Sequence, residues 1–469
     1  MQIWLINPYD ELPGEGVEGR YLRLAQELAD GSSVFVPRAG LRPDRWEMGG
    51  VDNSNIERPT SNVERRNEDV GEGDVTRGET SKVVWVSSGF RHRQKTRSES
   101  VEDRRLELGD GFTCMLVDAP AYRKNVSVGR LWSQWKWGRN VVTEMTRRVA
   151  SGELEKPDVV LASSPPLEGA WAGIRLARRF GAVSVVDFMD DWPATWLQVV
   201  TRSSSENGGF GNLVIGLRFW VGKILLWPWF RLARKVYRSA DAVSAQSHTF
   251  AARARELGHE GDVHVCYLGG SAAGDRRWQT ERPSPEGGAF HILYLGSMGR
   301  VYDIETVLRA AQKAQEAGRA WQWTFAGLDP DGRWEAKADE LGVSDMVSFA
   351  GFISGDELEK LKRSAHIGLV PMDPQSQVAV PYKVGDYLGA GLAVVNSLPG
   401  ELEHLLSEHG VGEPYTFGDP DSLYSAVSML ADHPDKRQAA QAAALDLFNL
   451  YFDRDITYPA FAQWVKDQA

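Results

Sequence analysis

Residues 381–391 place a cation, a carboxylate and small residues on one short predicted helix, which leads into a strand-like run. Lys383 and Asp386 lie three positions apart, and residues at that spacing share a face of a helix. Gly389 and Gly391 carry no side chain, so the backbone could approach a ligand closely there. A cation suits phosphate and a carboxylate suits sugar hydroxyl groups, so the segment is a candidate nucleotide-sugar site. The alternative is a capped helix with an ion pair on its surface.

The same segment resembles the P-x-K-x-x-E/D-Y-x-x-A-G motif of the GT-B glycosyltransferases, within the glycogen-synthase-like group called family 4. The resemblance implies that Lys383 stabilises the charge on a departing diphosphate and that Asp386 hydrogen-bonds ribose hydroxyl groups. The family's E-x7-E pair would fall at Val378 and Asp386, so the first acid is absent here and the second is shortened. The contact to the donor sugar must then come from elsewhere, with the loop 374–380 as a candidate.

A second strand, loop and helix unit begins at residue 290 and supplies further donor-side candidates. Gly296 and Ser297 follow its strand, and Arg300 lies before its helix, whose free N–H groups favour anions. The unit resembles the family's G-x-x-x-x-x-K-G segment in part, because Ser297 and Tyr302 stand where many members carry Arg and Lys. The resemblance implies that Arg300 supplies the missing charge as a second catalytic cation. The alternative for Arg300 is a solvated loop cation.

Two more donor-side candidates follow later strands of this unit. Residues 347–371 resemble the family's V-x-F-x-G block, whose loop contacts the nucleotide base, and Phe352 begins that loop. An ordinary core residue is the alternative for Phe352. Glu401 lies in the loop after the last predicted strand of the unit and is an additional candidate.

A glycine-rich loop, residues 14–19, precedes the first predicted helix and matches the G-x-G-x-x-G pattern. A dinucleotide fingerprint follows its strand at once and has an acid about 20 residues further on. Here seven residues separate the strand from Gly14, and the expected acidic position falls among Arg38, Ala39 and Gly40. The loop is better explained as an anion-favouring turn before a helix. In the family resembled, this loop borders the cleft, which nominates Gly14 and Gly16 for donor binding.

The first half of the chain carries candidates for the acceptor side. The S-S-P-P run at 163–166, the D-x-W-P run that includes Asp190 and Asp191, and the segment ending in His92 each follow a predicted strand. They resemble signatures of a subgroup that makes bacterial surface polysaccharides. Strand ends line the cleft of such sheets, so His92, Asp190 and Asp191 are acceptor-side candidates. Each could equally cap a helix or orient a loop.

Length and composition limit the possible classes of protein. A chain of 469 residues should form two or three domains. A formal net charge of −11 argues against a nucleic-acid partner, because phosphate-backbone affinity needs clustered cations. Cys114 and Cys266 lie far apart and favour a reducing compartment. Residues 1–8 are predicted to form a first strand rather than a signal peptide.

Alternation of apolar runs and helical patterns predicts an α/β protein with two Rossmann-like, doubly wound domains that face each other across a cleft. The predicted domains are residues 1–270 and 289–447, with a linker at 271–288. Residues 38–82 are polar and without a sustained period, which predicts a disordered insertion. Residues 448–469 are predicted to carry a helix, from Phe461 to Gln468, that packs back on the first domain.

An aromatic and basic segment, residues 214–237, suggests contact with a membrane surface. Arg218, Lys223 and Pro228 argue against a spanning helix, whereas interleaved Trp, Lys and Arg suit an interfacial one. A second patch of similar character lies around Trp132 and Trp135. Core helices with snorkelling cations are the alternative.

Together, the resemblance implies a retaining, metal-independent glycosyltransferase without a cofactor. It would move a sugar from a nucleotide-diphosphate sugar, with UDP as the expected nucleotide, to a glycan or lipid-linked acceptor in cell-surface polysaccharide synthesis. We expect it in the cytoplasm, on the inner face of the membrane. Two rivals are a nucleotide-sugar epimerase of the same architecture and a membrane-surface binding protein with a degenerate site, which the missing first acid motivates.

Overall fold

The computed structural model describes residues 1–10, 19–30, 81–92, 95–97, 105–201, 219–270, 289–299, 301–329 and 332–469. Gly14, Gly16, Arg300, the predicted linker and most of the predicted insertion lie outside these residues. The insertion ends earlier than predicted, because Ser81 is buried and Lys82 begins the second strand. The Lys82 N–H donates to the carbonyl oxygen of Met1 at 2.8 Å, which joins the returning chain to the sheet.

Within the described residues, the N-terminal domain contains a sheet of eight strands in the order β10-β9-β8-β7-β1-β2-β6-β5. All neighbouring pairs are parallel except β5 and β6. The central strands are continuous apolar runs, as expected for a parallel sheet that helices cover on both faces. The strands are β1 (Gln2–Ile6), β2 (Lys82–Ser88), β5 (Arg105–Gly109), β6 (Phe112–Val117), β7 (Val159–Ser164), β8 (Val183–Phe188), β9 (Ala242–Ala245) and β10 (Asp262–Val265). A short hairpin, β3 (Phe90–Arg91) with β4 (Thr96–Arg97), follows β2.

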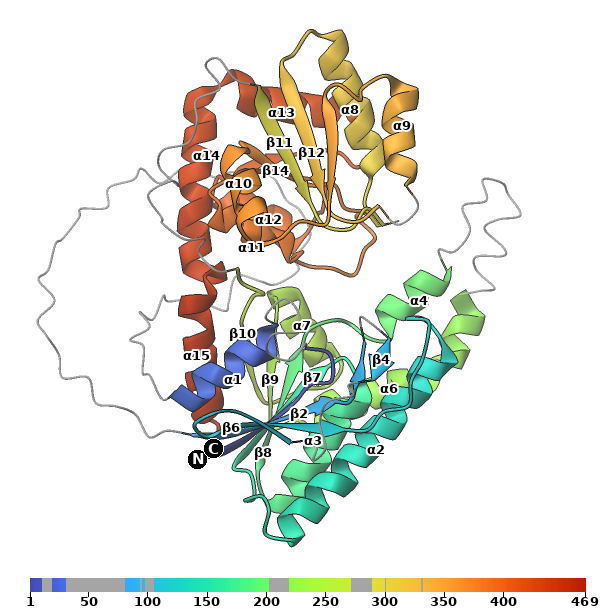
Figure 1. Ribbon diagram of the computed structural model, residues 1–469, viewed down its shortest axis with the longest axis vertical. Coiled ribbons are helices and arrows are strands. Elements are labelled where there is room, and N and C mark those ends of the chain that lie inside the picture. Colours follow the sequence, from blue (N-terminus) through green and yellow to red (C-terminus); the bar gives the residue numbers. More distant parts are fainter. Residues whose placement is uncertain are drawn as a thin grey trace, which may run out of the picture.

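Helices cover both faces of this sheet (Figure 1). One face packs against the first helix and the last helix of the chain, and the other packs against α2, α3 and α6. Helix α3 begins directly after the S-S-P-P run at 163–166 and ends before Gly181, which has a left-handed φ of 74°. Residues 219–225 are also helical, so the aromatic and basic segment forms two helical pieces. The helices are α1 (Arg20–Asp30), α2 (Val128–Ala150), α3 (Leu167–Phe180), α4 (Ala194–Thr201), α6 (Trp227–Ser239) and α7 (His248–Glu256).

The described part of the C-terminal domain contains a parallel sheet of six strands in the order β13-β12-β11-β14-β15-β16. Its strands are β11 (Phe290–Leu295), β12 (Trp321–Ala326), β13 (Val347–Gly351), β14 (Ile367–Val370), β15 (Ala393–Asn396) and β16 (Gly412–Pro414). Its helices are α8 (Ile304–Glu316), α9 (Arg333–Leu341), α10 (Gly355–Ser364), α11 (Lys383–Gly389), α12 (Glu401–Glu408), α13 (Pro420–Asp432) and α14 (Pro434–Leu447).

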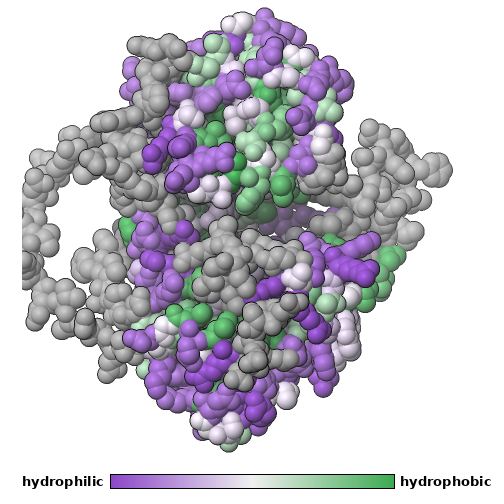
Figure 2. Space-filling view, in the orientation of Figure 1, coloured by the Kyte–Doolittle hydropathy of each residue, from purple (hydrophilic) through white to green (hydrophobic). Residues whose placement is uncertain are grey.

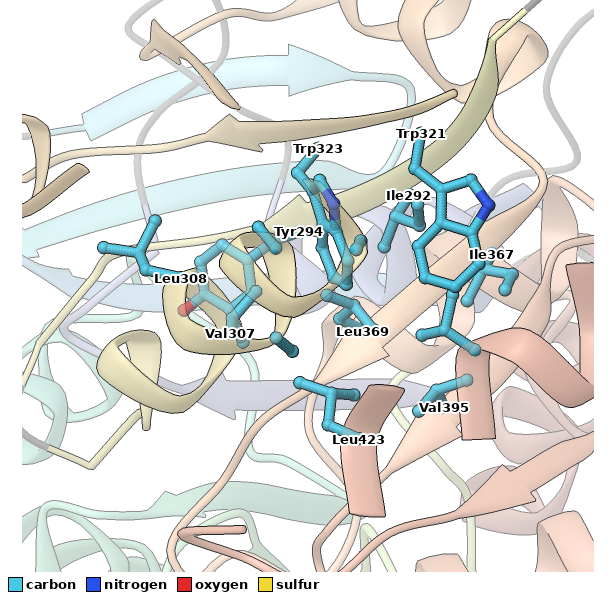
Figure 3. Packing of buried hydrophobic residues seen from close by; sticks show 14 of the residues in the cluster. Ile292, Tyr294, Val307, Leu308, Trp321, Trp323, Ile367, Leu369, Val395 and Leu423 are labelled. Carbon is cyan, nitrogen blue, oxygen red and sulfur yellow. The ribbon is translucent and has the colours of Figure 1, made fainter. Parts of the chain in front are cut away.

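Aromatic residues fill the core on one face of the second sheet. Tyr294, Trp321 and Trp323 lie there beside Val307 and Leu308 of α8 (Figure 3). Helices α11, α12 and α14 contribute to the core of the opposite face. Two doubly wound parallel sheets confirm the predicted α/β class and its division into two domains.

The chain returns to the first domain through a five-residue π-helix, Phe448–Phe452, and the helix α15 (Arg454–Lys466). This helix begins earlier than the predicted Phe461, and Phe461 and Val465 pack into the N-terminal core. Gly270 lies beside the junction of the π-helix and α15. Its N–H donates to Phe452 O at 3.0 Å, and the Arg454 N–H donates to Gly270 O at 3.1 Å. Gly270, the last described residue of the N-terminal domain, therefore lies beside the chain that returns from the C-terminal domain.

One buried ion pair fixes α1 to the first sheet. The Arg20 guanidinium contacts both oxygens of Asp187, at 3.1 and 3.3 Å, and both side chains are almost fully buried. Tyr21 and Ser244 donate to the same carboxylate at 2.7 and 2.6 Å. The carboxylate thus has both an opposite charge and neutral donors, which is what a buried charge requires.

The carboxyl ends of the two sheets face each other. Backbone N–H groups in the first turn of α7, which follows β9, donate to the Glu401 carboxylate, which follows β15. A second contact joins Gln198 of α4, which donates to Gln375 O at 3.0 Å. Each of these contacts joins segments that follow the carboxyl ends of strands in the two sheets. Figures 1 and 2 show the domains stacked along the long axis of the molecule, with this junction between them.

Candidate active site

Lys383 lies at the start of α11 and is 7% exposed. Its ammonium nitrogen is 3.9 Å from the centre of the Tyr294 ring and 4.0 Å from the centre of the Tyr302 ring. In the described part of the chain this nitrogen has no hydrogen-bond partner. Burial lowers the pKa of Lys383 well below its usual range, because the charged form loses water. The two rings attract the cation but provide no counter-charge.

The position of Lys383 follows from a tyrosine on the same helix. The Tyr387 hydroxyl accepts from Leu295 N–H at 2.7 Å and donates to Leu369 O at 3.1 Å, which ties α11 to the ends of β11 and β14. Gly368 makes room for the ring, since a Cβ at that position would lie 2.5 Å from Tyr387 Cγ. Lys383 is therefore held at the carboxyl edge of the sheet, where ligands bind in this class of fold.

The loop after β11 brings the backbone against Lys383. Gly296 has a φ of +117°, and a Cβ there would lie 3.3 Å from Lys383 Nζ. Gly327, after β12, has a φ of +153°, and a Cβ there would lie 1.9 Å from Gly296 O. These positions need glycine because of conformation and space. Ser297 is exposed beside them, and its carbonyl oxygen accepts from the Tyr294 hydroxyl at 2.7 Å. The structure thus brings Gly296 and Ser297 close to Lys383.

Asp386 has different surroundings from Lys383. Burial raises the pKa of this carboxyl, Lys362 and Arg454 lower it, and Glu359 raises it. A Cβ on Gly270 would lie 3.7 Å from Asp386 Oδ1, so the carboxylate also borders the segment that joins the domains. Whether it binds ribose stays a prediction.

The expectation that Gly389 and Gly391 admit a ligand is wrong. A Cβ at Gly389 would lie 2.8 Å from the Phe448 ring. Gly391 has a φ of +60°, and its Cβ would lie 3.1 Å from Leu445. Both glycines make room for the packing of helix α14 and the π-helix against α11.

Glu401 connects the two domains. Its carboxylate accepts from the backbone N–H groups of His248 and Thr249 at 2.8 and 2.7 Å, and from the Tyr267 hydroxyl at 2.6 Å. The two N–H groups belong to the first turn of α7, which ordinarily lacks backbone partners. Both oxygens of this predicted donor-side residue are thus engaged by the N-terminal side of the molecule.

Phe352 follows β13 and is 69% exposed. It is therefore not a core residue, which was the alternative explanation of its place in the sequence. An exposed ring at the carboxyl end of a strand is available for stacking on a planar ligand.

On the acceptor side, His92 joins an aromatic group at the ends of β1 and β2. Its ring lies 5.0 Å from the Tyr9 ring, and Nδ1 contacts the Tyr122 hydroxyl. A small cavity that these three residues share is also lined by Ser88 and Gln134. His92 is placed at the edge of the sheet that faces the other domain.

Asp190 and Asp191 hold their own loop. Asp190 accepts from Trp192 Nε1 at 2.9 Å and from Thr195 Oγ1 at 2.8 Å, and Asp191 forms an ion pair with Arg253 at 2.9 Å. Burial raises the pKa of both carboxyl groups. These contacts match the loop-orienting alternative, and the acceptor-side role stays a prediction.

Sequence reasoning missed the residues that surround these candidates. Tyr302 stands where the family carries a cation, yet its ring and that of Tyr294 enclose Lys383. Arg130, near the exposed Trp132, is itself buried beside Tyr9 and Trp192. An available signal was the position of Tyr302, which stands where the family carries a cation.

The described residues contain no group of three or more His, Cys, Asp and Glu side chains able to hold a metal ion. None of their helices is both long and apolar enough to cross a bilayer.

Comparison with known families gives a match for each domain. Residues 84–269 match the family described as "Glycosyl transferase 4-like domain", and residues 289–433 match "Glycosyl transferases group 1". A curated relative, an uncharacterised glycosyltransferase of Methanocaldococcus jannaschii, is 29% identical over 164 residues. That match covers 34% of this chain and 40% of the relative.

Two solved structures have a similar fold. Sucrose-phosphate synthase from Thermosynechococcus elongatus gives a TM-score of 0.65 at 15% identity and covers 99% of this chain and 98% of its own. The HepE protein of Anabaena in complex with UDP and glucose gives a TM-score of 0.56 at 13% identity, with full coverage of both chains. At these identities the likeness establishes the fold.

Proposed function

The chain belongs to the GT-B glycosyltransferases, and from that premise we propose that it transfers a sugar from a nucleotide-diphosphate sugar, with UDP as the nucleotide, to a glycan or lipid-linked acceptor. The observation that carries the proposal is the Lys383 ammonium group. It is buried between two tyrosine rings beside a glycine loop, with no partner in the described residues. A buried cation without a counter-charge is costly unless an anion binds it.

The diphosphate of a donor supplies that anion. Lys383 would stabilise the negative charge that grows on the leaving phosphate as the bond between the sugar C1 and the phosphate oxygen breaks. The acceptor hydroxyl oxygen forms the new bond to C1, and its proton passes to an oxygen of the leaving nucleoside diphosphate. In this scheme the attack comes from the face that the leaving group occupied, configuration is retained, and no metal ion is needed.

The surface of the N-terminal domain favours an acceptor at a membrane. Trp132, Trp220 and Trp227 are each more than half exposed. Cationic side chains lie over some of the exposed rings of this surface, as Arg231 does over Trp227 at 4.7 Å. Exposed indole rings with adjacent cations suit the headgroup level of a bilayer. Figure 2 shows apolar surface at the right-hand edge of this domain. We propose peripheral attachment on the cytoplasmic face of the membrane and a role in cell-surface polysaccharide synthesis.

The direct test is the variant Lys383→Ala. We expect UDP to raise the melting temperature of the unchanged protein and not of the variant, and we expect the variant to lose sugar transfer while staying folded. Lys337→Ala is the matched control, because Lys337 lies on α9 of the same domain and pairs with Glu340 at 2.8 Å. Retained turnover in Lys383→Ala would refute the assignment.

Product analysis separates this function from an epimerase of the same architecture. Incubation with UDP-sugars and membrane lipid extract should yield glycosylated product and free UDP. Epimerised donor without release of UDP would replace the proposed function by its rival.

A further inference from the structure

Arg130 is a second buried cation, in the N-terminal domain, and no carboxylate among the described residues forms an ion pair with it. It lies on the first turn of α2, whose N-terminal residue Ser127 accepts the Arg130 N–H at 3.2 Å. The side chain is 7% exposed; its guanidinium donates to Asn125 O at 3.0 Å and to the Tyr9 hydroxyl at 3.2 Å. Its Nε has no partner among the described residues, and it forms no ion pair there. Burial raises the pKa of Glu168 and the charge of Arg130 opposes this, but the Glu168 carboxylate accepts its hydrogen bond from Trp229 Nε1, at 2.8 Å.

This arrangement calls for an anionic ligand. A guanidinium group keeps its proton in proteins, so Arg130 cannot become neutral to avoid the cost of burial. It lies 4.5 Å over the Trp192 ring, which attracts the cation without compensating its charge. Phosphate is the anion whose geometry a guanidinium matches best.

An apolar groove begins next to Arg130. It lies between α2, α4, α6 and the helical residues 219–225, and it encloses about 640 Å³, within the range of small-molecule sites. Its lining is almost wholly apolar and includes Val128, Leu131, Trp132, Trp135, Trp196 and Leu225.

Trp196 connects the groove to the cation. Trp196 lines the groove, its ring lies 4.7 Å from that of Trp192, and the Arg130 guanidinium is 5.6 Å from the Trp196 ring. Two other rings of the lining, Trp132 and Trp135, are exposed. Arg139 lies 4.7 Å over Trp135 there, so the rim combines cations with indole rings.

We propose that this groove binds the hydrocarbon chain of a lipid phosphate and that Arg130 contacts its phosphate. The proposal rests on the proposed function, because it names the lipid-linked acceptor of that site. A peptide occupant would leave backbone N–H and C=O groups unpaired against an apolar lining. A hydrocarbon chain has no such groups. The charge of Arg130 at the inner end matches a phosphate headgroup that lies toward the cleft.

The test uses dodecyl phosphate with the full-length protein, below the concentration at which it forms micelles. We expect calorimetry to show binding of dodecyl phosphate at least tenfold tighter than that of dodecanol or of inorganic phosphate. Arg130→Gln should weaken binding of dodecyl phosphate at least tenfold, and Arg130→Lys should restore part of it. UDP should still raise the melting temperature of both variants, which shows that they are folded.

Two neighbouring residues provide a matched pair for the groove. Leu225 lines it and Ile224 does not, although their exposures are similar, at 68% and 70%. Leu225→Glu should weaken dodecyl phosphate binding and Ile224→Glu should not. Equal effects of the two, or equal binding by Arg130→Gln and the unchanged protein, would overturn the proposal. If UDP binds and dodecyl phosphate does not, the lipid site is wrong and the donor site stands; failure of UDP to bind would count against the proposed function instead.

Discussion

Arg20 in the N-terminal domain and Lys383 in the C-terminal domain are both buried cations, but their partners differ. Arg20 contacts both oxygens of Asp187, and two hydroxyl groups complete that carboxylate. Lys383 has two aromatic rings and no hydrogen-bond partner in the part of the chain that the structure describes. The first arrangement is complete within the protein, whereas the second lacks a counter-charge, which the proposed function assigns to the donor diphosphate.

The presence or absence of a counter-charge distinguishes a buried charge that stabilises the fold from one that is available to a ligand. Removing one member of a complete buried pair leaves the other uncompensated, so the folded state loses stability. Removing an uncompensated buried cation relieves the folded state, so stability rises and ligand binding is lost. The two cations should therefore respond to neutral substitution with opposite signs.

Asp187→Asn is the substitution expected to have the largest effect. It leaves the Arg20 guanidinium buried without a counter-charge, which costs about 3–5 kcal/mol of unfolding free energy. Urea denaturation measures the loss. Glu155→Gln is the control in the same domain, since its pair with Lys82 is exposed, at 65% and 63%, and such pairs contribute about 0.2–1 kcal/mol. Similar losses for both variants would contradict the distinction between a buried ion pair and an exposed one.

Lys383→Met should change stability and activity in opposite directions. Methionine keeps the length of the side chain and removes the charge, so the melting temperature should rise, by about 2–4 °C for each kcal/mol regained in a domain of this size. Turnover should fall about 10²–10³-fold, the usual effect of removing a group that stabilises charge in a transition state. Calorimetry and a UDP-release assay measure the two effects. A fall in melting temperature would show that Lys383 has a structural partner after all.

Glu401→Gln extends the comparison to a carboxylate that joins the two domains and has hydrogen-bond donors at both oxygens. The amide cannot accept from both α7 N–H groups and the Tyr267 hydroxyl as the carboxylate does, and hydrogen bonds to charged groups contribute about 1.5–3 kcal/mol. Lower thermal stability and a larger radius of gyration in solution scattering are expected. Glu403→Gln, an exposed change on the same helix, should leave both quantities unaltered.

Local sequence patterns predicted the fold because the elements are locally determined. The run at residues 159–162 is apolar on both faces, which indicates a buried parallel strand, and α3 shows its helical period and the Gly181 at its C-terminus directly. The division into two sheets follows from the repetition of these units. Only the boundaries shifted, as at Lys82 and at the start of α15.

Contacts between distant segments could not be predicted in the same way. Gly389 was taken for a ligand-approach position, but Phe448, 59 positions further along the chain, determines its role. Tyr302 was interpreted as a missing cation, whereas its ring completes the surroundings of Lys383. Glu401 was assigned to the donor, yet its partners lie about 150 residues away in the sequence. Long-range contacts of this kind leave no periodic signal.

The pH dependence of UDP binding is the smallest effect and tests the charge of Lys383 directly. Burial lowers its pKa in the folded protein, whereas the unfolded chain keeps the ordinary value. Between these two values the unfolded state binds more protons, so stability rises with pH in that window, and the cost of the buried charge is fully present below it. UDP requires the ammonium form. Its affinity should therefore be constant below the folded pKa and fall above it by up to tenfold per pH unit, about 1.4 kcal/mol. In calorimetry, UDP binding in that window should be accompanied by proton uptake, seen as a dependence of the heat on the ionisation enthalpy of the buffer. Lys383→Met should bind UDP weakly at every pH and take up no proton, so a pH profile that persists in this variant would assign the titration to another group.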